Sequence, residues 1–245
     1  MRIERVKFEI IDKNEWENLE IKGQLKPIGR EMQGTITYNG KLEFPNIQYE
    51  APEKKEKTID LNFISGIEAK GEETKTEEAG NENEEEETKT TDIVPVNKNE
   101  GEVKEGTYLI VFGGRHGEDF SQEILCLDLE TLEWKYLGNM PFTICAHSCE
   151  LANDKVFVFG GTDGMQFLDN LYYFDLKNRQ WYVYRRGKNE EILPRIAASM
   201  SYNADKQEIL IFGGCSYEDE LNETKILPVD EDSLKKLFQP LKVEK

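Results

Sequence analysis

The sequence has few residues of the kinds that bind metals or form disulfides. Its 245 residues include only two histidines, His116 and His147. The four cysteines, none spaced as Cys-x-x-Cys, are Cys126, Cys145, Cys149 and Cys215. Structural zinc sites take four closely spaced Cys or His ligands, and disulfide-rich domains are typical of secreted proteins. We therefore expect reduced, buried thiols, no metal and no cofactor.

Long hydrophobic runs and an excess of positive charge are also missing. No stretch approaches the roughly 20 apolar residues of a membrane-spanning helix, and Met1–Ile10 alternates charged with apolar residues, unlike a secretory signal. The 31 basic residues face 49 acidic ones, for a net charge of -18. Binding to phosphates or anionic lipids depends on Lys and Arg. The sequence thus predicts a soluble, cytoplasmic protein whose partners are basic or mixed-charge proteins, with no nucleic acid and no membrane.

What the sequence does contain is a repeat of nearly fifty residues. A glycine pair, an aspartate and a tryptophan recur 47 positions apart, as Gly113-Gly114, Asp128 and Trp134 and then as Gly160-Gly161, Asp175 and Trp181. A proline and a Phe-Gly-Gly triplet recur 53 positions apart, as Pro141 and Phe159 and then as Pro194 and Phe212. A period near fifty residues with these features is typical of a β-propeller, with one blade per repeat.

The best repeat divides into four short strands. Alternating apolar and polar residues, together with β-branched and aromatic residues between turns, predict strands at Thr143–Leu151, Val156–Phe159, Asn170–Leu176 and Gln180–Tyr184. Weaker versions of the same pattern give Tyr108–Phe112, Glu123–Leu129, Glu133–Leu137, Ile196–Tyr202, Glu208–Phe212 and Thr224–Val229. The fold class we expect is all-β, with four-stranded antiparallel blades.

The first 64 residues hold a degenerate version of the repeat. Val6–Ile11 and Trp16–Ile21 have the pattern of a third and a fourth strand. Thr35–Tyr38 and Lys41–Phe44 flank Asn39-Gly40, which is a favoured two-residue hairpin turn. We therefore expect a hairpin there, in a blade of its own.

The pattern stops between Ser65 and Gly106, which carries 14 acidic and five basic residues. A segment this polar cannot bury enough surface to offset the entropy lost on ordering, so we expect a disordered acidic insertion at 65–106. It acts as a spacer or as an acidic docking segment, and Ile93–Val96 returns as a strand within it. The repeats then occupy 107–230. A short helix within Ser233–Leu241 is expected in the tail, 231–245, because four apolar residues there have helical spacing.

At these spacings the sequence resembles the Kelch family of β-propellers. The runs YLIVFGG, VFVFGG and EILIFGG, and then CLDLETLEW and YFDLKNRQW, carry the resemblance over 107–214, with a partial match over 1–64. Ten residues have structural roles in this motif: Gly113, Gly114, Asp128, Trp134, Gly160, Gly161, Asp175, Trp181, Gly213 and Gly214. Glycines permit close backbone approach, aspartates begin turns, and buried tryptophans wedge between sheets. Arg30, Arg195 and His147 match the family's positions before the first strand, so His147 is expected to be structural.

The number of blades follows from pairing the two ends of the chain. If Val6–Ile11 and Trp16–Ile21 complete the sheet that Ile196–Phe212 begins, the ring has about four blades, whereas the family usually has five to seven. Either the ring is small, or another chain or further sequence completes a larger one. An open blade would leave an unpaired strand edge, which proteins normally cover.

The resemblance implies a non-catalytic protein-interaction module that presents its loops to a partner. Loops between second and third strands share one face with the connections between blades. The candidate partner-binding residues on that face are Arg115, His116, Phe120, Asp163, Met165, Phe167, Arg186 and Tyr217. An alternative is a structural subunit of a larger cytoskeletal or ciliary assembly. Propeller enzymes that bind copper or iron are the least favoured class, because the chain has two histidines and lacks the motifs G-x-S-x-G and GxxxxGK[ST].

Overall fold

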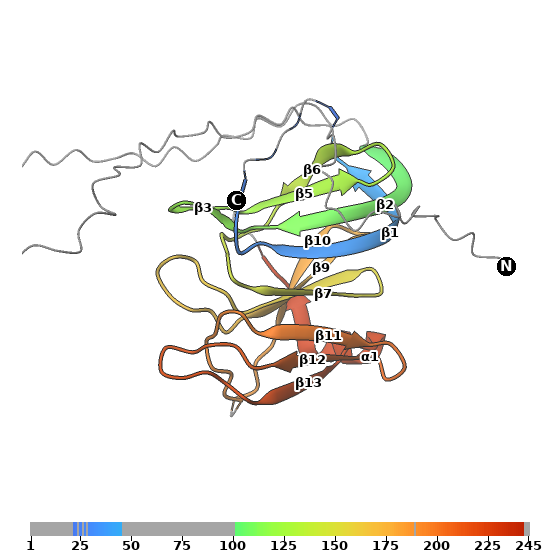
Figure 1. Cartoon of the computed structure of the whole chain (residues 1–245). Coiled ribbons are helices and arrows are strands. Elements are labelled where there is room, and N and C mark those ends of the chain that lie inside the picture. Colours follow the sequence, from blue (N-terminus) through green and yellow to red (C-terminus); the bar gives the residue numbers. More distant parts are fainter. Residues whose placement is uncertain are drawn as a thin grey trace, which may run out of the picture.

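The computed structural model of the chain describes residues 22, 23, 25, 27, 29–45, 101–188 and 190–242. Within these ranges the regular structure is almost entirely antiparallel β-sheet, and the all-β expectation is confirmed. Three sheets follow one another from the top to the bottom of Figure 1. We call them the first, second and third blade.

The first blade has four strands, in the order β1-β2-β5-β6. These are β1 (Gly34–Phe44), β2 (Glu102–Phe112), β5 (Glu123–Asp128) and β6 (Glu133–Asn139). A small ribbon, β3 (Arg115–His116) paired with β4 (Asp119–Phe120), lies between β2 and β5 in the chain. Alternate residues of β1 are buried along its whole length, which is the pattern of a strand with one face on a core.

The second blade has five strands and the third blade has three. The second is ordered β14-β10-β9-β8-β7 and the third β11-β12-β13. Their bounds are β7 (Ser148–Ala152), β8 (Lys155–Phe159), β9 (Leu171–Asp175), β10 (Gln180–Tyr184), β11 (Ser199–Asn203), β12 (Glu208–Phe212), β13 (Thr224–Pro228) and β14 (Phe238–Pro240). The chain therefore leaves the third blade after three strands and adds its last strand to the outer edge of the second.

The predicted hairpin at Asn39-Gly40 is wrong. β1 runs straight through these residues, which pair with Thr107 and Gly106 in the middle of β2. The eleven-residue pairing of β1 with β2 gives both halves of β1 a hydrogen-bonded partner, which a short hairpin on its own would not do. The segments expected to form two blades thus form one, and the described residues hold three blades where about four were expected.

The acidic segment interrupts this first blade. Phe44, at the end of β1, is paired with Glu102, at the start of β2, so the intervening residues connect two neighbouring strands. Because β2 begins at Glu102, the expected insertion boundary at 106 is too late. Ile93–Val96, Val6–Ile11 and Trp16–Ile21 lie outside the described residues. The place beside β12 that we assigned to Val6–Ile11 is occupied by β13.

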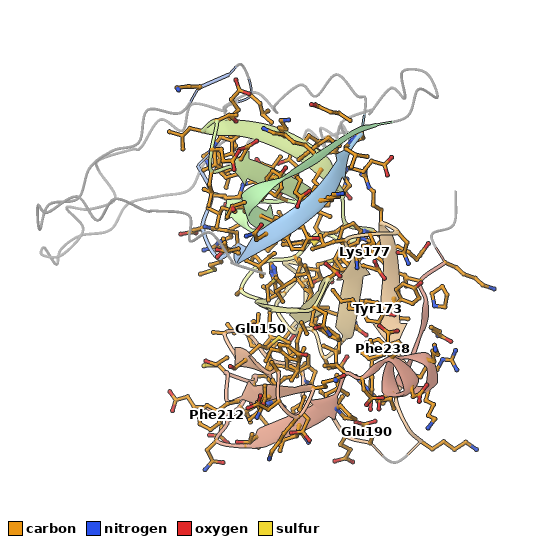
Figure 2. The ribbon with its side chains drawn as sticks, turned by 90° about the vertical axis from the view of Figure 1, so that its right-hand side faces the viewer. Glu150, Tyr173, Lys177, Glu190, Phe212 and Phe238 are labelled. Carbon is orange, nitrogen blue, oxygen red and sulfur yellow. The ribbon has the colours of Figure 1, made fainter. Side chains whose placement is uncertain are left out.

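The predicted helix in the tail is present but shorter than its apolar spacing indicates. α1 spans Glu231–Leu237, and its N-cap Asp230 accepts hydrogen bonds from the backbone N–H groups of Asp232 and Ser233. Phe238 then begins β14, which pairs with β10. Figure 2 shows Phe238 beside Tyr173, and their ring centroids are 4.9 Å apart. Burial of Phe238 in this aromatic cluster ends the helix at Leu237.

Two apolar layers hold the blades together. One lies between the first and second blades and the other between the second and third. Trp181 on β10 belongs to the first layer, where its ring meets Phe112 of the first blade edge-on at 6.5 Å. Asp128 and Asp175 each accept two backbone N–H bonds from the turns that follow them, within 2.9–3.1 Å. The tryptophan supplies contact between blades, and the aspartates shape the β5–β6 hairpin of the first blade and the β9–β10 hairpin of the second.

The backbone also links neighbouring blades. A short lead-in precedes the first strand of each blade, at residues 30–32, 144–146 and 195–197. Gly114 N–H donates to the carbonyl of Ile144 at 2.9 Å, and Gly161 N–H donates to the carbonyl of Arg195 at 2.8 Å. A Cβ on Gly160 would lie 2.5 Å from that same Arg195 oxygen. The glycine pair thus lets the lead-in of the next blade approach closely.

Candidate protein-binding face

The loops between the second and third strands of the three blades lie at the same end of the sheets (left in Figure 1). They span residues 113–122, 160–170 and 213–223, and we call this end the loop face. Each loop is closed by a β-bridge between equivalent residues. The bridges join Arg115 to Phe120, Thr162 to Phe167, and Cys215 to Glu220. The three loops are therefore three copies of one shape.

Hydrogen bonds within each loop fix that shape. Asp163 Oδ1 accepts from the backbone N–H groups of Met165 and Gln166, both at 2.9 Å. Burial alone would raise the pKa of Asp163, but the hydrogen bonds from Gln166 and Met165 outweigh it and lower the pKa. Ser216 Oγ holds the equivalent turn by accepting from Asp219 N–H at 3.0 Å. The side chain of Asp163, a candidate contact residue, is thus occupied in shaping its own loop.

Each loop also rests on the next. The ring of Phe120 lies against Gly164 of the second blade, where a Cβ would be 2.8 Å from the ring. Phe167 stacks on Tyr217 of the third blade, with ring centroids 4.3 Å apart and planes 9° apart. The Tyr217 hydroxyl accepts a hydrogen bond from the backbone N–H of Phe167. The two phenylalanines are half-buried and connect the loops. Of the predicted residues, the structure brings Phe167 and Tyr217 together, while Phe120 contacts Gly164 of the second loop.

The large apolar side chains exposed on the three loops themselves are Met165 and Tyr217. Met165 is 90% exposed and Tyr217 is 63% exposed. Both sit on loops whose backbone is held by internal hydrogen bonds, so a partner that covers them orders little additional chain. Large side chains on preorganised loops are well suited to binding, because less entropy is lost on association.

The basic residues of the loop face are already engaged. Arg115 Nε donates to Glu31 Oε1 at 2.9 Å, and Arg186 Nη1 pairs with Asp169 Oδ2 at 2.9 Å. His116 Nδ1 lies 2.7 Å from the carbonyl oxygen of Gly29. Sequence reasoning missed Glu31 and Asp169 as their partners. Arg115 and His116 therefore hold the first loop to the residues before the first blade, and Arg186 holds the connection after β10 to the second loop.

Acidic side chains dominate the rest of the loop tips. Five are exposed there: Glu118, Asp119, Glu218, Asp219 and Glu220. Like charges this close repel one another, and an approaching basic group relieves that repulsion. A run of carboxylates in the first and third loops could have been recognised in the sequence, where Glu118-Asp119 and Glu218-Asp219-Glu220 stand at the predicted loops.

His147 lies away from the loop tips, near the inner strands. It is buried, and neither ring nitrogen has a hydrogen-bond partner among the described residues. Burial lowers the pKa of His147 to about 4, so the ring is neutral at pH 7. A Cβ on Gly34 would lie 2.5 Å from His147 Nε2. The ring is packed between the first strands of two blades.

The described residues contain no group of three or more His, Cys, Asp or Glu side chains placed to hold a metal. All four cysteines are free thiols. Cys126 and Cys145 are buried as expected, but Cys149 is half-buried and Cys215 is exposed. None of the described helices is long and apolar enough to span a bilayer.

Residues 80–237, well over half of the chain, match the KLHDC2/KLHL20/DRC7 Kelch-repeats domain. The chain is similar to Kelch domain-containing protein 10 of Homo sapiens, with 29% identity over 118 residues (46% of this chain and 27% of that protein). It is also similar to Kelch domain-containing protein 2 of Bos taurus, with 30% identity over 113 residues (43% and 27%). A shorter match, 39% identical over 57 residues, is to the Leucine-zipper-like transcriptional regulator 1 homolog of Drosophila melanogaster (23% and 6%). Each match spans little more than a quarter of the relative's length or less.

Proposed function

Since the chain belongs to the Kelch-repeat family, we propose that it is a non-catalytic interaction module whose loop face binds a protein partner. The observation that carries this proposal is the set of three equivalent loops, stacked on one another and fixed by internal hydrogen bonds, that present Met165 and Tyr217 to solvent. A rigid surface with exposed Met and Tyr side chains has the composition of a protein interface.

The charge of the loop tips indicates the chemistry of the partner. Exposed carboxylates lie on the first and third loops, while Arg115 and Arg186 are paired with Glu31 and Asp169. A partner segment with Lys or Arg beside an apolar anchor would complement both features. Charge complementarity of this kind mainly raises the association rate and the specificity, so binding should weaken as salt is added.

Affinity capture with matched variants tests the proposal. The full chain, a Met165→Ser/Tyr217→Ser variant and a Val103→Ser control serve as baits in the same lysate. Val103 is 64% exposed on β2, near the end of the blade opposite to the loops, so the control removes a similar exposed apolar side chain elsewhere. Losing an apolar anchor at the centre of an interface typically costs 2 kcal/mol or more, about 30-fold in affinity.

The expected result is that specific partners are lost with the loop variant and kept with the control. Because Tyr217→Ser also removes the stacking on Phe167, urea unfolding of all three chains checks that each is folded under the capture conditions. Equal retention by the loop variant and the wild type would rule out the loop face as the binding surface. Unequal unfolding midpoints would be resolved with single substitutions, starting with Met165→Ser, because its side chain is 90% exposed.

A structural role in a larger assembly, cytoskeletal or ciliary, is the second candidate. It is favoured by the exposed apolar side chains on the third blade, where Phe212 is 53% exposed and Ile226 is 60% exposed. That surface is distinct from the loop face.

A further inference from the structure

The third blade has an outward face that nothing in the described structure covers. Side chains alternate along its strands, so Ile209 and Ile211 point toward the second blade while Phe212 points away. Ile226 on β13 pairs with Leu210 and shares this outward face. Phe212 is 53% exposed and Ile226 is 60% exposed, and Figure 2 shows Phe212 at the margin of the third blade.

The equivalent positions in the other two blades are buried under the blade that follows. Phe112 and Phe159 stand at the same place in the Phe-Gly-Gly motif as Phe212, and they are 0% and 2% exposed. Tyr173 of the second blade occupies the position of Ile226 and is 5% exposed. The outward face of the third blade thus carries the apolar residues of a blade-to-blade contact without a blade against it.

The backbone hydrogen bonds between neighbouring blades also stop at the third blade. Ala146 N–H donates to the carbonyl of Met32, and Ala197 N–H donates to the carbonyl of Ala146, so the lead-ins form a chain of hydrogen bonds along the three blades. Within the described residues, this chain ends at the Ala197 carbonyl. Gly214 N–H is likewise without the lead-in carbonyl that Gly114 and Gly161 bind.

The opposite end of the molecule offers the complementary groups. Met32 N–H is unbonded among the described residues, at the position where Ala146 and Ala197 donate. Arg30 in this lead-in has the arrangement of Arg195. Arg30 donates to the Gly113 carbonyl at 3.1 Å and pairs with Glu123, as Arg195 donates to the Gly213 carbonyl at 3.2 Å and pairs with Glu223.

The position of Arg195 predicts one further contact for a first blade that follows a third blade. The Arg195 guanidinium lies 5.7 Å from the ring centroid of Phe159 in the preceding blade, a cation–π distance. Arg30 is the equivalent of Arg195, and Phe212 is the equivalent of Phe159. A first blade placed after a third blade would therefore bring Arg30 over the exposed ring of Phe212.

We propose that the outward face of the third blade binds the first blade of a second copy of this chain. In this arrangement Gly214 N–H donates to the partner copy's Arg30 carbonyl, and Met32 N–H of the partner copy donates to the Ala197 carbonyl. Two copies related by a two-fold axis make this contact twice and close a ring of six blades. The loop faces of both copies then lie on the same side of the ring.

The outer part of the first blade limits how the second copy seats. Leu125 and Leu127 are already buried, whereas Thr35 and Thr37 on β1 are exposed on the side away from the second blade. Val111 on β2, which pairs with Thr35, is also buried, so the contact is carried by β1 and the lead-in. Direct packing of two third blades on each other is disfavoured, because it would leave the ring of Phe212 without an arginine in the position that Arg195 has over Phe159.

The oligomeric state tests this proposal independently of any loop-face partner. Sedimentation equilibrium of the full chain at micromolar concentrations should give a dimer with about twice the monomer mass of 28.4 kDa. Phe212→Asp/Ile226→Asp should shift the chain to monomer, with at least a tenfold weaker dimer. Both side chains are more than half exposed, so the monomer keeps its fold. Met165→Asp, 90% exposed on the loop face, is the matched control and should leave the dimer intact.

A mixing experiment tests whether the third blade of one copy meets the first blade of the other. Thr35→Glu/Thr37→Glu places charges on the other partner surface and should also give a monomer by itself. Mixing it with Phe212→Asp/Ile226→Asp should restore a heterodimer held by one intact junction. A wild-type chain that stays monomeric, a dimer that survives Phe212→Asp/Ile226→Asp, or a mixture that forms no heterodimer would each overturn the proposal.

Discussion

Adding a single Cβ atom at a glycine of the paired motif, and measuring the loss of stability, tests how closely neighbouring blades approach. Gly160 and Gly213 occupy the same motif position with nearly the same backbone, at φ values of 65° and 67°. A Cβ on Gly160 would lie 2.5 Å from the Arg195 carbonyl of the next lead-in. On Gly213 the nearest atom would be the Leu221 carbonyl oxygen of the same blade, at 3.1 Å. The two sites differ chiefly in whether a following blade is present.

The expected loss of stability follows from these two terms. An alanine in the left-handed region costs about 1–2 kcal/mol at either site. Forcing a Cβ against the Arg195 carbonyl adds the cost of overpacking, about 1–3 kcal/mol. We therefore expect Gly160→Ala to lower the free energy of unfolding by about 2–5 kcal/mol and Gly213→Ala by about 1–2 kcal/mol. Gly29→Ala is the control, since nothing lies within 4 Å of its Cβ position.

Urea unfolding followed by tryptophan fluorescence measures these losses, since Trp181 is buried between blades. The series is made in the Phe212→Asp/Ile226→Asp background, so that a second copy does not cover Gly213. Equal losses for Gly160→Ala and Gly213→Ala would refute the close approach of the third blade's lead-in to Gly160.

Two further predictions concern His147 and the acidic segment. The pKa of His147 is about 4 in the folded chain because of burial and about 6.5 in the unfolded chain. Between these pH values the unfolded state binds more protons, so the free energy of unfolding should fall by about 3 kcal/mol as the pH drops from 6.5 to 4. Burial raises the pKa of Glu150, so this carboxyl group stabilises the folded chain as the pH drops, opposite to His147. The test is therefore the difference between wild type and His147→Leu in urea unfolding at pH 7 and pH 5. A variant with the same pH dependence as wild type would exclude this role. Replacing residues 46–100 with a two-residue Asn-Gly turn should keep the fold, since Phe44 pairs with Glu102, and should stabilise it by up to about 3 kcal/mol through the shorter loop. Loss of cooperative unfolding would contradict the pairing of β1 with β2.

Local patterns in the sequence are enough to place most strands of the second blade. β10 has the bounds that its aromatic and β-branched run predicts, and β8 differs by one residue. The pairing of β1 with β2 could not be predicted in this way, because the two strands are separated by the acidic segment and nothing local says which strand each will meet. The favourable turn residues Asn39-Gly40 were overridden by the longer pairing.

The candidate site was likewise predictable only in part. The repeat spacing located the loops, and with them Phe120, Met165, Phe167 and Tyr217. It could not show that Phe120 and Phe167 contact the neighbouring loops while Met165 stays exposed. Such contacts depend on the angle between blades, and a one-dimensional pattern does not contain that angle.

Recognition of a protein at the loop face is the central claim. Its most direct measurement is the dissociation constant of a captured partner for the full chain, for Met165→Ser/Tyr217→Ser and for Val103→Ser. We predict that the loop variant binds about 30-fold more weakly or worse and that Val103→Ser binds as the full chain does. An unchanged dissociation constant for the loop variant would contradict the claim, whatever the result for Val103→Ser.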